Sequence, residues 1–377
     1  MHSAFLEEKI GVVVHGPEII DSGYALLLIN YLKKGASVEA VLGGTMGRVA
    51  VIDAGLEDVI TISPRRRPSQ SIQDLQATSD LIFLLNQAKS RESGLVFGTM
   101  VAKAAGINKP LIQIDCGGRF VAVLSGKESD NEMALQVASD LGLDCLLHPT
   151  LPGVSSGEKA TKRAICAVIP GELISVNGVV IGRATENLVE VEAKDGRIVG
   201  LKGANPKEHG LEKLSWVEVD LEKAIIRSGS IRRSEVRPIP RVCERVDRRE
   251  GEGEWAVLID HCAEDAFEAA QGASVAVTVG DDTTLIAGDI LVRLGIPIIG
   301  IVDGDLDRLA GCTAMLPGSV VLRVMPGHDD QVGRRVKDEI FRGERQICIS
   351  STDLAKRVEK MAGEQLVEIE HIKPDFP

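Results

Sequence analysis

The stretch SVAVTVGDDTTLIAGDILVRLGIPIIGIVDG, residues 274–304, decides the fold class because it reads as a strand, a helix and a second strand. Its two apolar runs, 274–279 and 297–302, are rich in Val and Ile, and the segment 284–294 between them has a helical pattern. Strands that alternate with helices in this way are typical of βαβ units. The stretch therefore predicts a parallel sheet covered by helices.

The same alternation recurs in the first third of the chain. The apolar runs KIGVVVH (9–15), VEAVLG (38–43), DLIFLLN (80–86) and PLIQID (110–115) are separated by segments with helical patterns. We therefore expect a second parallel sheet, with helices on both faces.

The middle of the chain has a different pattern. Asn177-Gly178 and Asp195-Gly196 each stand between two β-rich runs. These dipeptides supply the positive φ angles that type I′ turns need, so each predicts a β-hairpin. A small β domain is expected here.

A chain of 377 residues exceeds the roughly 250–300 residues that one core usually serves. We expect an α/β fold with two parallel-sheet α/β lobes and a small β-hairpin domain between them. The arginines of the stretch 227–249 alternate with Glu and Asp and with prolines, so we interpret that stretch mainly as a solvated linker. The expected boundaries are 1–155 for a Rossmann-like N-terminal α/β domain, 160–235 for the small β domain, 236–252 for an Arg-rich linker and 253–377 for the C-terminal α/β domain.

Composition narrows the classes of partner. A net charge of −12 and a pI near 5.2 disfavour nucleic acid, whose phosphates need clustered Lys and Arg. The seven cysteines form no C-x-x-C pair and follow no secretory segment, which indicates a reducing cytoplasm. No apolar run reaches the roughly 18 residues of a membrane helix. A small-molecule ligand and a homo-oligomer are compatible with the sequence, and no motif points to zinc, haem or NAD.

Carboxylates follow several predicted strands of the C-terminal lobe. Ligands of open parallel sheets bind at the carboxyl ends of the strands, and Mg²⁺ prefers oxygen ligands. An EF-hand is excluded because Ala314 stands where its bidentate Glu would be. In the alternative interpretation these aspartates only cap the helices that follow, with Asp282 or Thr283 as one cap and Asp305 or Asp307 as the next. The candidate metal ligands are Asp303 and Asp305, assisted by Asp281 or Asp282.

Anion-binding candidates lie on two loops that precede helices. The loop LGGTMGR, residues 42–48, combines glycines, a Thr and an Arg where a phosphate would meet a helix N-terminus. Its alternative interpretation is a glycine-rich turn with a solvated Arg. The phosphate or ligand-binding candidates are Gly43, Gly44, Thr45, Arg48, Thr283 and Thr284, and the candidate general bases are His15 and His328.

These features lead to one leading hypothesis and one rival. The leading hypothesis is a Mg²⁺-dependent enzyme that acts on a phosphorylated or nucleotide-like small molecule bound at the strand ends. The rival is a non-catalytic ligand-sensing or assembly protein, in which backbone N–H groups occupy the aspartates.

Four segments together carry a resemblance: VVVHGPEIIDSGYA, GGTMGRVAVIDAGLE, VGDDTTLIAGDIL and PIIGIVDGDLD. With them the chain resembles an uncharacterised archaeal family found mainly in methanogens. The resemblance covers most of the chain and implies a cytoplasmic archaeal protein. It supplies no activity that could be transferred residue by residue.

A shorter segment carries a second likeness. GRFVAVLSGKESDNEMALQVASDLG, residues 118–142, is similar to the part of the cobalt-precorrin hydrolase of cobalamin biosynthesis where a strand, a Ser-Gly turn and a helix follow one another. Residues 127–130 here replace the His and the glycine-rich stretch of that family. The likeness implies a further alternative, an enzyme or carrier of tetrapyrrole metabolism.

Overall fold

The computed structural model consists of two compact units, Met1–Ile239 and Pro240–Pro377, which we describe separately. The finer domain boundaries within these two units stay predictions. The structure describes residues 8–45, 47–62, 66–147, 149, 156–157, 160–165, 168–177, 179–215, 218–221, 224, 226–229, 232–234, 253–260, 262–304 and 315–373.

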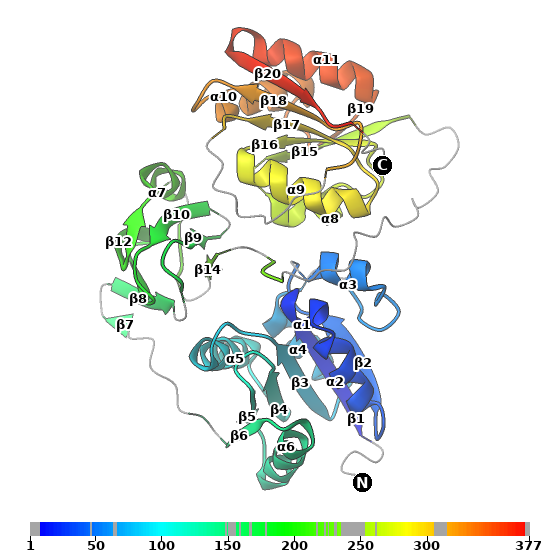
Figure 1. The fold of residues 1–377 in the computed structure, drawn as a ribbon, viewed down its shortest axis with the longest axis vertical. Coiled ribbons are helices and arrows are strands. Elements are labelled where there is room, and N and C mark those ends of the chain that lie inside the picture. The colour runs from blue at the N-terminus through cyan, green and yellow to red at the C-terminus, as the bar shows by residue number, and fades with distance from the viewer. Residues whose placement is uncertain are drawn as a thin grey trace. The chain divides into compact units, whose positions relative to one another are not determined.

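The first unit opens with a six-stranded sheet of order β2-β1-β3-β4-β5-β6 (Figure 1). Strand β1 pairs in parallel with both β2 and β3, and β3 pairs in parallel with β4. The strands are β1 (Lys9–His15), β2 (Ser37–Leu42), β3 (Leu81–Asn86), β4 (Leu111–Asp115), β5 (Phe120–Ser125) and β6 (Asp144–Leu147). The helices are α1 (Glu18–Asp21), α2 (Tyr24–Leu32), α3 (Arg48–Ala54), α4 (Pro68–Leu75), α5 (Arg91–Ala105) and α6 (Glu128–Leu141).

Helices cover both faces of this sheet. Residues of α1, α2, α3 and α6 pack with Val12 and Val14 of β1 in one apolar cluster. Residues of α4 and α5 pack with Val13 of the same strand in another. Successive residues of a strand point to opposite faces, so the unbroken apolar run of β1 supplies both cores, as expected for a strand buried on both sides.

Strand β5 departs from the predicted parallel pattern, because it pairs antiparallel with β4. Only residues 116–119 join these strands. A parallel crossover needs a dozen or more residues, whereas a short turn reverses the chain. The segment 118–142 does form the expected strand, turn and helix, as β5 and α6. A βα unit of this kind is common to many sheets and carries no tetrapyrrole function by itself.

The rest of the first unit contains two four-stranded sheets, β13-β10-β9-β14 and β12-β11-β8-β7, around one apolar core (Figure 1). Both predicted hairpins are confirmed: β9 and β10 pair antiparallel around Asn177, and β11 and β12 around Asp195-Gly196. Asn177, Asp195 and Gly196 have φ of 49°, 50° and 74°, as type I′ turns require. The elements are β7 (Ser156–Gly157), β8 (Ala160–Ile165), β9 (Leu173–Val176), β10 (Val179–Ala184), β11 (Val189–Lys194), β12 (Arg197–Lys202), β13 (Ala204–Pro206), α7 (Glu208–Ser215) and β14 (Ile226–Ser228).

The second unit has a six-stranded sheet of order β19-β15-β16-β17-β18-β20. Its four central strands are parallel, as predicted, whereas both edge strands pair antiparallel, which the sequence did not indicate. The strands are β15 (Trp255–Asp260), β16 (Val275–Val279), β17 (Ile298–Val302), β18 (Val320–Val324), β19 (Gln346–Cys348) and β20 (Leu366–His371). The helices are η1 (Ala263–Asp265), α8 (Ala266–Ala269), α9 (Asp281–Arg293), α10 (Asp329–Arg335), η2 (Val336–Ile340), α11 (Ser351–Ala362) and η3 (Gly363–Gln365).

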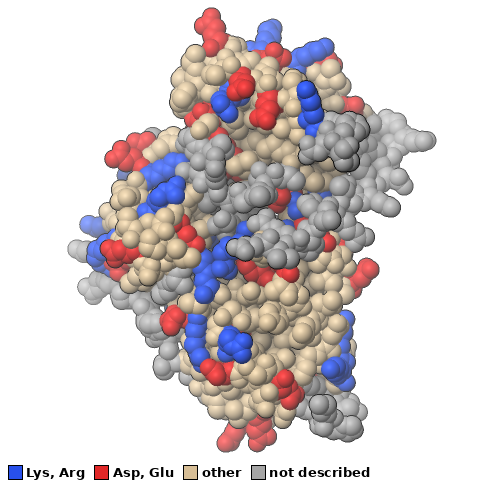
Figure 2. Space-filling view, viewed as in Figure 1, with Lys and Arg blue, Asp and Glu red and all other residues tan. Residues whose placement is uncertain are grey.

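The predicted α/β fold class is thus confirmed, with several parallel or mixed sheets and helices packed against them. None of the helices in the described part of the chain is long and apolar enough to cross a membrane. On the face drawn in Figure 2, acidic and basic side chains are interspersed over the described residues. Charges of both signs therefore neighbour each other on this face, although the chain carries a net charge of −12.

Candidate functional site

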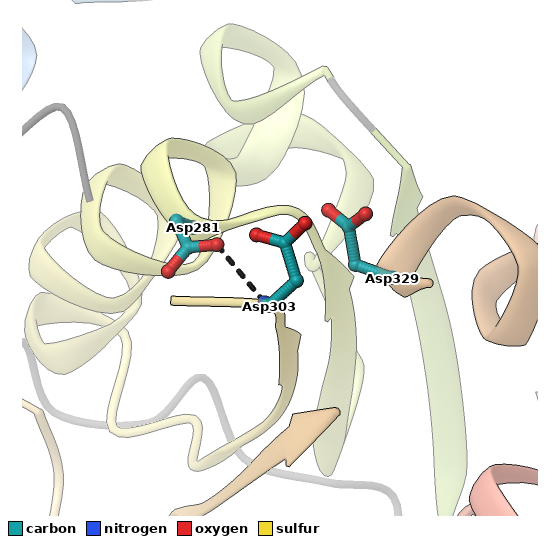
Figure 3. A group of neighbouring side chains, drawn as sticks. All are labelled: Asp281, Asp303 and Asp329. Carbon is teal, nitrogen blue, oxygen red and sulfur yellow. Dashed lines mark hydrogen bonds between the residues drawn. The ribbon is translucent and has the colours of Figure 1, made fainter. Parts of the chain in front are cut away.

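Three aspartates meet at the carboxyl edge of the C-terminal sheet. Asp281 opens α9 after β16, Asp303 follows β17, and Asp329 opens α10 after β18. These strands are parallel neighbours, so their ends lie side by side. One carboxylate oxygen of each aspartate lies within 4.8 Å of the others (Figure 3). The group offers the oxygen donors that a divalent cation prefers.

Backbone N–H groups hold these carboxylates in place. Asp281 accepts hydrogen bonds from the N–H of Asp303 at 3.1 Å and of Gly304 at 3.3 Å. Asp303 accepts from the N–H of Gly327 at 2.7 Å, and Asp329 accepts from the N–H of Asp330 at 2.8 Å. The Asp281 and Asp303 carboxylates thereby connect the strand-end loops of neighbouring strands, whereas Asp329 is bonded to the adjacent residue of its own helix.

The alternative that Asp282 or Thr283 caps α9 does not hold. The residue that caps α9 is Gly280, with φ 98°, and no side chain caps the helix. Asp281 is instead the first helical residue, where the helix dipole favours a negative charge. Its carboxylate reaches across to the loop after β17 (Figure 3).

Burial makes the group electrostatically costly. Asp281 is 4% exposed and Asp329 is 7% exposed. Buried carboxylates of like charge are unfavourable unless a cation, a proton or hydrogen-bond donors compensate them. The hydrogen bonds described above supply part of that compensation, and a bound cation would supply more.

The structure brings together two of the four predicted metal ligands, Asp281 and Asp303. Asp282 is not part of the group found among the described residues, and Asp305 lies outside those residues. Asp329 was missed, although it carried a usable signal. It stands in the segment PGHDD (326–330), which follows β18 as the other aspartates follow their strands.

The other candidates of this unit lie differently. The Thr284 hydroxyl is 2.9 Å from the Thr278 hydroxyl and is buried beside the sheet. The Thr284 hydroxyl is thus engaged with the sheet, and phosphate binding by Thr284 stays a prediction. Thr283 is also buried. His328 precedes Asp329, and its Nδ1 lies 3.0 Å from the carbonyl oxygen of Pro326; its role as a base stays a prediction.

His15 ends β1 at the carboxyl edge of the N-terminal sheet. Its Nδ1 lies 2.8 Å from the Gly43 carbonyl oxygen, and its ring stacks on Phe97 with centroids 4.4 Å apart. Burial lowers the pKa of His15 to about 4, and the positive charge of Arg227 adds to this effect. A neutral ring must donate from Nδ1 to that carbonyl, which leaves Nε2 as an acceptor. A base with such a low pKa accepts a proton only weakly at neutral pH.

This lowered pKa predicts a pH dependence of stability. Below pH 6.5 the unfolded chain protonates His15 while the folded protein does not, so stability falls until the pH reaches the folded pKa of about 4. The His15 residue is partly exposed, so solvent screening reduces this effect. We expect the free energy of unfolding to fall by about 1–2 kcal/mol. Urea unfolding of the wild type and His15→Gln from pH 7 to pH 4 measures it. Parallel pH curves for the two proteins would contradict the lowered pKa.

The glycine amides of the predicted anion-binding loop already donate hydrogen bonds to carbonyl groups of the protein. The Gly43 N–H donates to the Val14 carbonyl at 2.8 Å, and the Gly44 N–H donates to the Arg66 carbonyl at 2.7 Å. Arg48 is 4% exposed, and its Nε donates to the Ile62 carbonyl at 3.0 Å. Arg48 is thus not a solvated side chain. Helix α3 begins only at Arg48, so Thr45 does not cap it. Phosphate binding by this loop stays a prediction that its two glycine amides do not favour.

The interpretation of the stretch 227–249 as solvated is wrong at Arg232, which is 7% exposed. Its Nε donates to Asp21 at 2.7 Å and its Nη1 donates to Asp53 at 2.8 Å, while Nη2 also pairs with Asp21. Both aspartate side chains are fully buried. Local sequence could not show this pairing, because its partners lie 211 and 179 residues away.

Comparison with known proteins agrees with the resemblance found in the sequence. The family model described as "Uncharacterized protein conserved in archaea (DUF2117)" matches residues 12–344. The chain belongs to this archaeal family. It is also similar to "Uncharacterized protein MJ0065" of Methanocaldococcus jannaschii, with 43% identity over 338 residues, which cover 86% of this chain and 90% of that protein. No solved structure matches the chain.

Proposed function

We propose that the chain is a Mg²⁺-dependent enzyme and that Asp281, Asp303 and Asp329 hold the metal. The observation that carries this proposal is the convergence of three carboxylates from three successive parallel strand ends. Asp305, two residues after Asp303 in the sequence, remains a predicted fourth ligand.

The proposed substrate is a phosphorylated or nucleotide-like small molecule. Mg²⁺ in proteins keeps several waters and usually takes one or two carboxylates together with a substrate phosphate. Carboxylates at the strand ends of an open parallel sheet stand where such ligands enter. The metal would stabilise the negative charge that develops during phosphoryl chemistry. His328, directly before Asp329, is the nearest candidate base in the sequence.

Calorimetric titration with Mn²⁺, as a stand-in for Mg²⁺, tests the metal site directly. We expect the wild type to bind the ion and Asp303→Asn to bind it at least about tenfold more weakly, because a neutral amide replaces a charged ligand. Asp338→Asn is the matched control, since Asp338 is an exposed aspartate of the same unit. A wild type that binds no Mn²⁺ or Mg²⁺ at millimolar concentration, or an Asp303→Asn variant that binds as the wild type does, would overturn the proposal.

A second candidate is a non-catalytic ligand-sensing or assembly protein. The observation in its favour is that each of the three aspartates accepts a hydrogen bond from a backbone N–H. The two candidates are compatible in geometry, because a carboxylate has about four acceptor positions and metal-ligating carboxylates are commonly hydrogen-bonded as well. The titration distinguishes them, since purely structural aspartates need no ion.

A further inference from the structure

The strand order of the N-terminal sheet marks a place where ligands commonly bind. In the order β2-β1-β3-β4 the chain adds β2 on one side of β1 and then adds β3 on the other side. The switch point therefore lies between β1 and β3. His15 and Asn86, the last residues of these two strands, are register partners. In open α/β sheets the crevice outside such a switch point is the usual ligand site. We refer to the region outside the ends of these two strands, His15 and Asn86, as the switch-point crevice.

A distant part of the same unit contacts the segments that follow β1 and β3. We define the strap as residues 226–229, which include β14, together with residues 232–234. Arg233 donates its N–H to the Glu18 carboxylate at 3.0 Å and its guanidinium to the Gln87 carbonyl at 3.5 Å. Glu18 follows β1 and Gln87 follows β3. One residue of the strap therefore contacts the loops on both sides of the switch point.

The other piece of the strap contacts the same edge of the sheet. Lys89, three residues after β3, donates to the carbonyl oxygen and to the hydroxyl of Ser228, each at 2.8 Å. It also pairs with Glu172 at 2.8 Å. Burial lowers the pKa of Lys89, while the carboxylate of Glu172 opposes that shift. The strap is thus fastened to the loop after β3 at two separate points.

The contacts of the strap described above are polar, whereas apolar packing holds the strands of the N-terminal sheet. Strand β14 has three residues and, among the described strands, lies at the edge of its sheet beside β9. Its residues are half-buried. Ile226 of the strap packs against the apolar core of the β domain, and Arg232 makes a buried polar contact with Asp21 and Asp53. Segments with few buried apolar contacts open at a lower free energy than core strands.

We propose that the strap is a releasable cover of the switch-point crevice, and that a small molecule reaches the crevice only when the strap has opened. Arg232 acts as the catch: while it holds Asp21 and Asp53, Arg233 stays on Glu18 and Gln87. The strap is also the last described segment before the boundary of the first unit at Ile239. This cover belongs to the first unit and is independent of the metal proposed for the second.

Native-state hydrogen exchange of the full chain, followed by mass spectrometry at increasing low concentrations of urea, tests whether the strap opens. The Gly229 N–H, which donates to Leu173 at 2.9 Å, is a reporter of the strap. We expect it to exchange through an opening that depends little on urea, unlike the amides of β3. If strap and β3 amides exchange with the same urea dependence, the strap opens only by global unfolding and the proposal is wrong.

Two substitutions test the catch. Arg232→Lys keeps the charge but loses the two-pronged hydrogen bond, so we expect strap exchange to rise by on the order of tenfold or more. Arg197→Lys, at an exposed arginine of β12, should leave it unchanged. Carbodiimide labelling of Glu18 should rise in Arg232→Lys alone. If Glu18 labelling stays at the wild-type level while the strap exchanges faster, the strap covers no crevice.

Discussion

Arg232→Met is expected to lower the free energy of unfolding of the first unit by about 3–5 kcal/mol, because removing one partner of a buried ion pair leaves an uncompensated charge. Here two carboxylates would lose this guanidinium at once, since Arg232 binds both Asp21 and Asp53. Methionine keeps much of the side-chain volume, so the effect reports the charge rather than a cavity. The measurement is equilibrium urea unfolding followed by a probe in the first unit.

A compensated variant makes this prediction specific. Asp21→Asn/Asp53→Asn/Arg232→Met removes all three charges together, and replacing a whole buried ion cluster is often close to neutral. We expect it to recover most of the stability lost in Arg232→Met. If Arg232→Met unfolds within about 1 kcal/mol of the wild type, the arginine behaves as a surface ion pair and the buried contact is refuted.

Mn²⁺ at one hundred times its dissociation constant is expected to stabilise the second unit by about 2.7 kcal/mol, because a ligand that binds only the folded state shifts the unfolding equilibrium. Removal of the ion with EDTA should reverse the effect completely. Thermal unfolding with and without Mn²⁺ provides the measurement. Asp303→Asn should show no shift, whereas Asp338→Asn should shift as the wild type does.

The same experiment in EDTA separates the two candidate functions. If the three aspartates form a metal site, Asp303→Asn relieves repulsion between like charges and should unfold at or above the wild-type temperature. If Asp303 serves only to bind the Gly327 N–H, its loss weakens a charge-assisted hydrogen bond and should lower that temperature. A lower temperature together with an absent Mn²⁺ shift would favour the structural role.

Sequence predicted the parts of the fold that are decided locally. The hairpins at Asn177 and at Asp195-Gly196 followed from two-residue turns, and the parallel strands of the second unit followed from their apolar runs. The reversal at β5 was missed, although the four residues between β4 and β5 contained the information. A short connection limits the direction of the next strand more strictly than apolar content does.

The candidate site was predictable only in part, because it depends on which strands become neighbours. Asp281 and Asp303 were proposed together, and their strands are indeed adjacent. Asp329 required knowledge that β18 adds beside β17, which follows from sheet order rather than from any motif. The same limit applies to Arg232, since no local pattern distinguishes a buried arginine from a solvated one.

The long separation between Arg232 and its partners has a consequence for synthesis on the ribosome. Domains generally fold from the N-terminus as the chain emerges, and the strands of the first sheet end at Leu147. Asp21 and Asp53 nevertheless pair with Arg232, which is synthesised 211 and 179 residues later. A nascent chain that has completed β6 therefore still lacks the guanidinium that binds these two interior carboxylates. This buried ion pair can form only after the β domain has been translated.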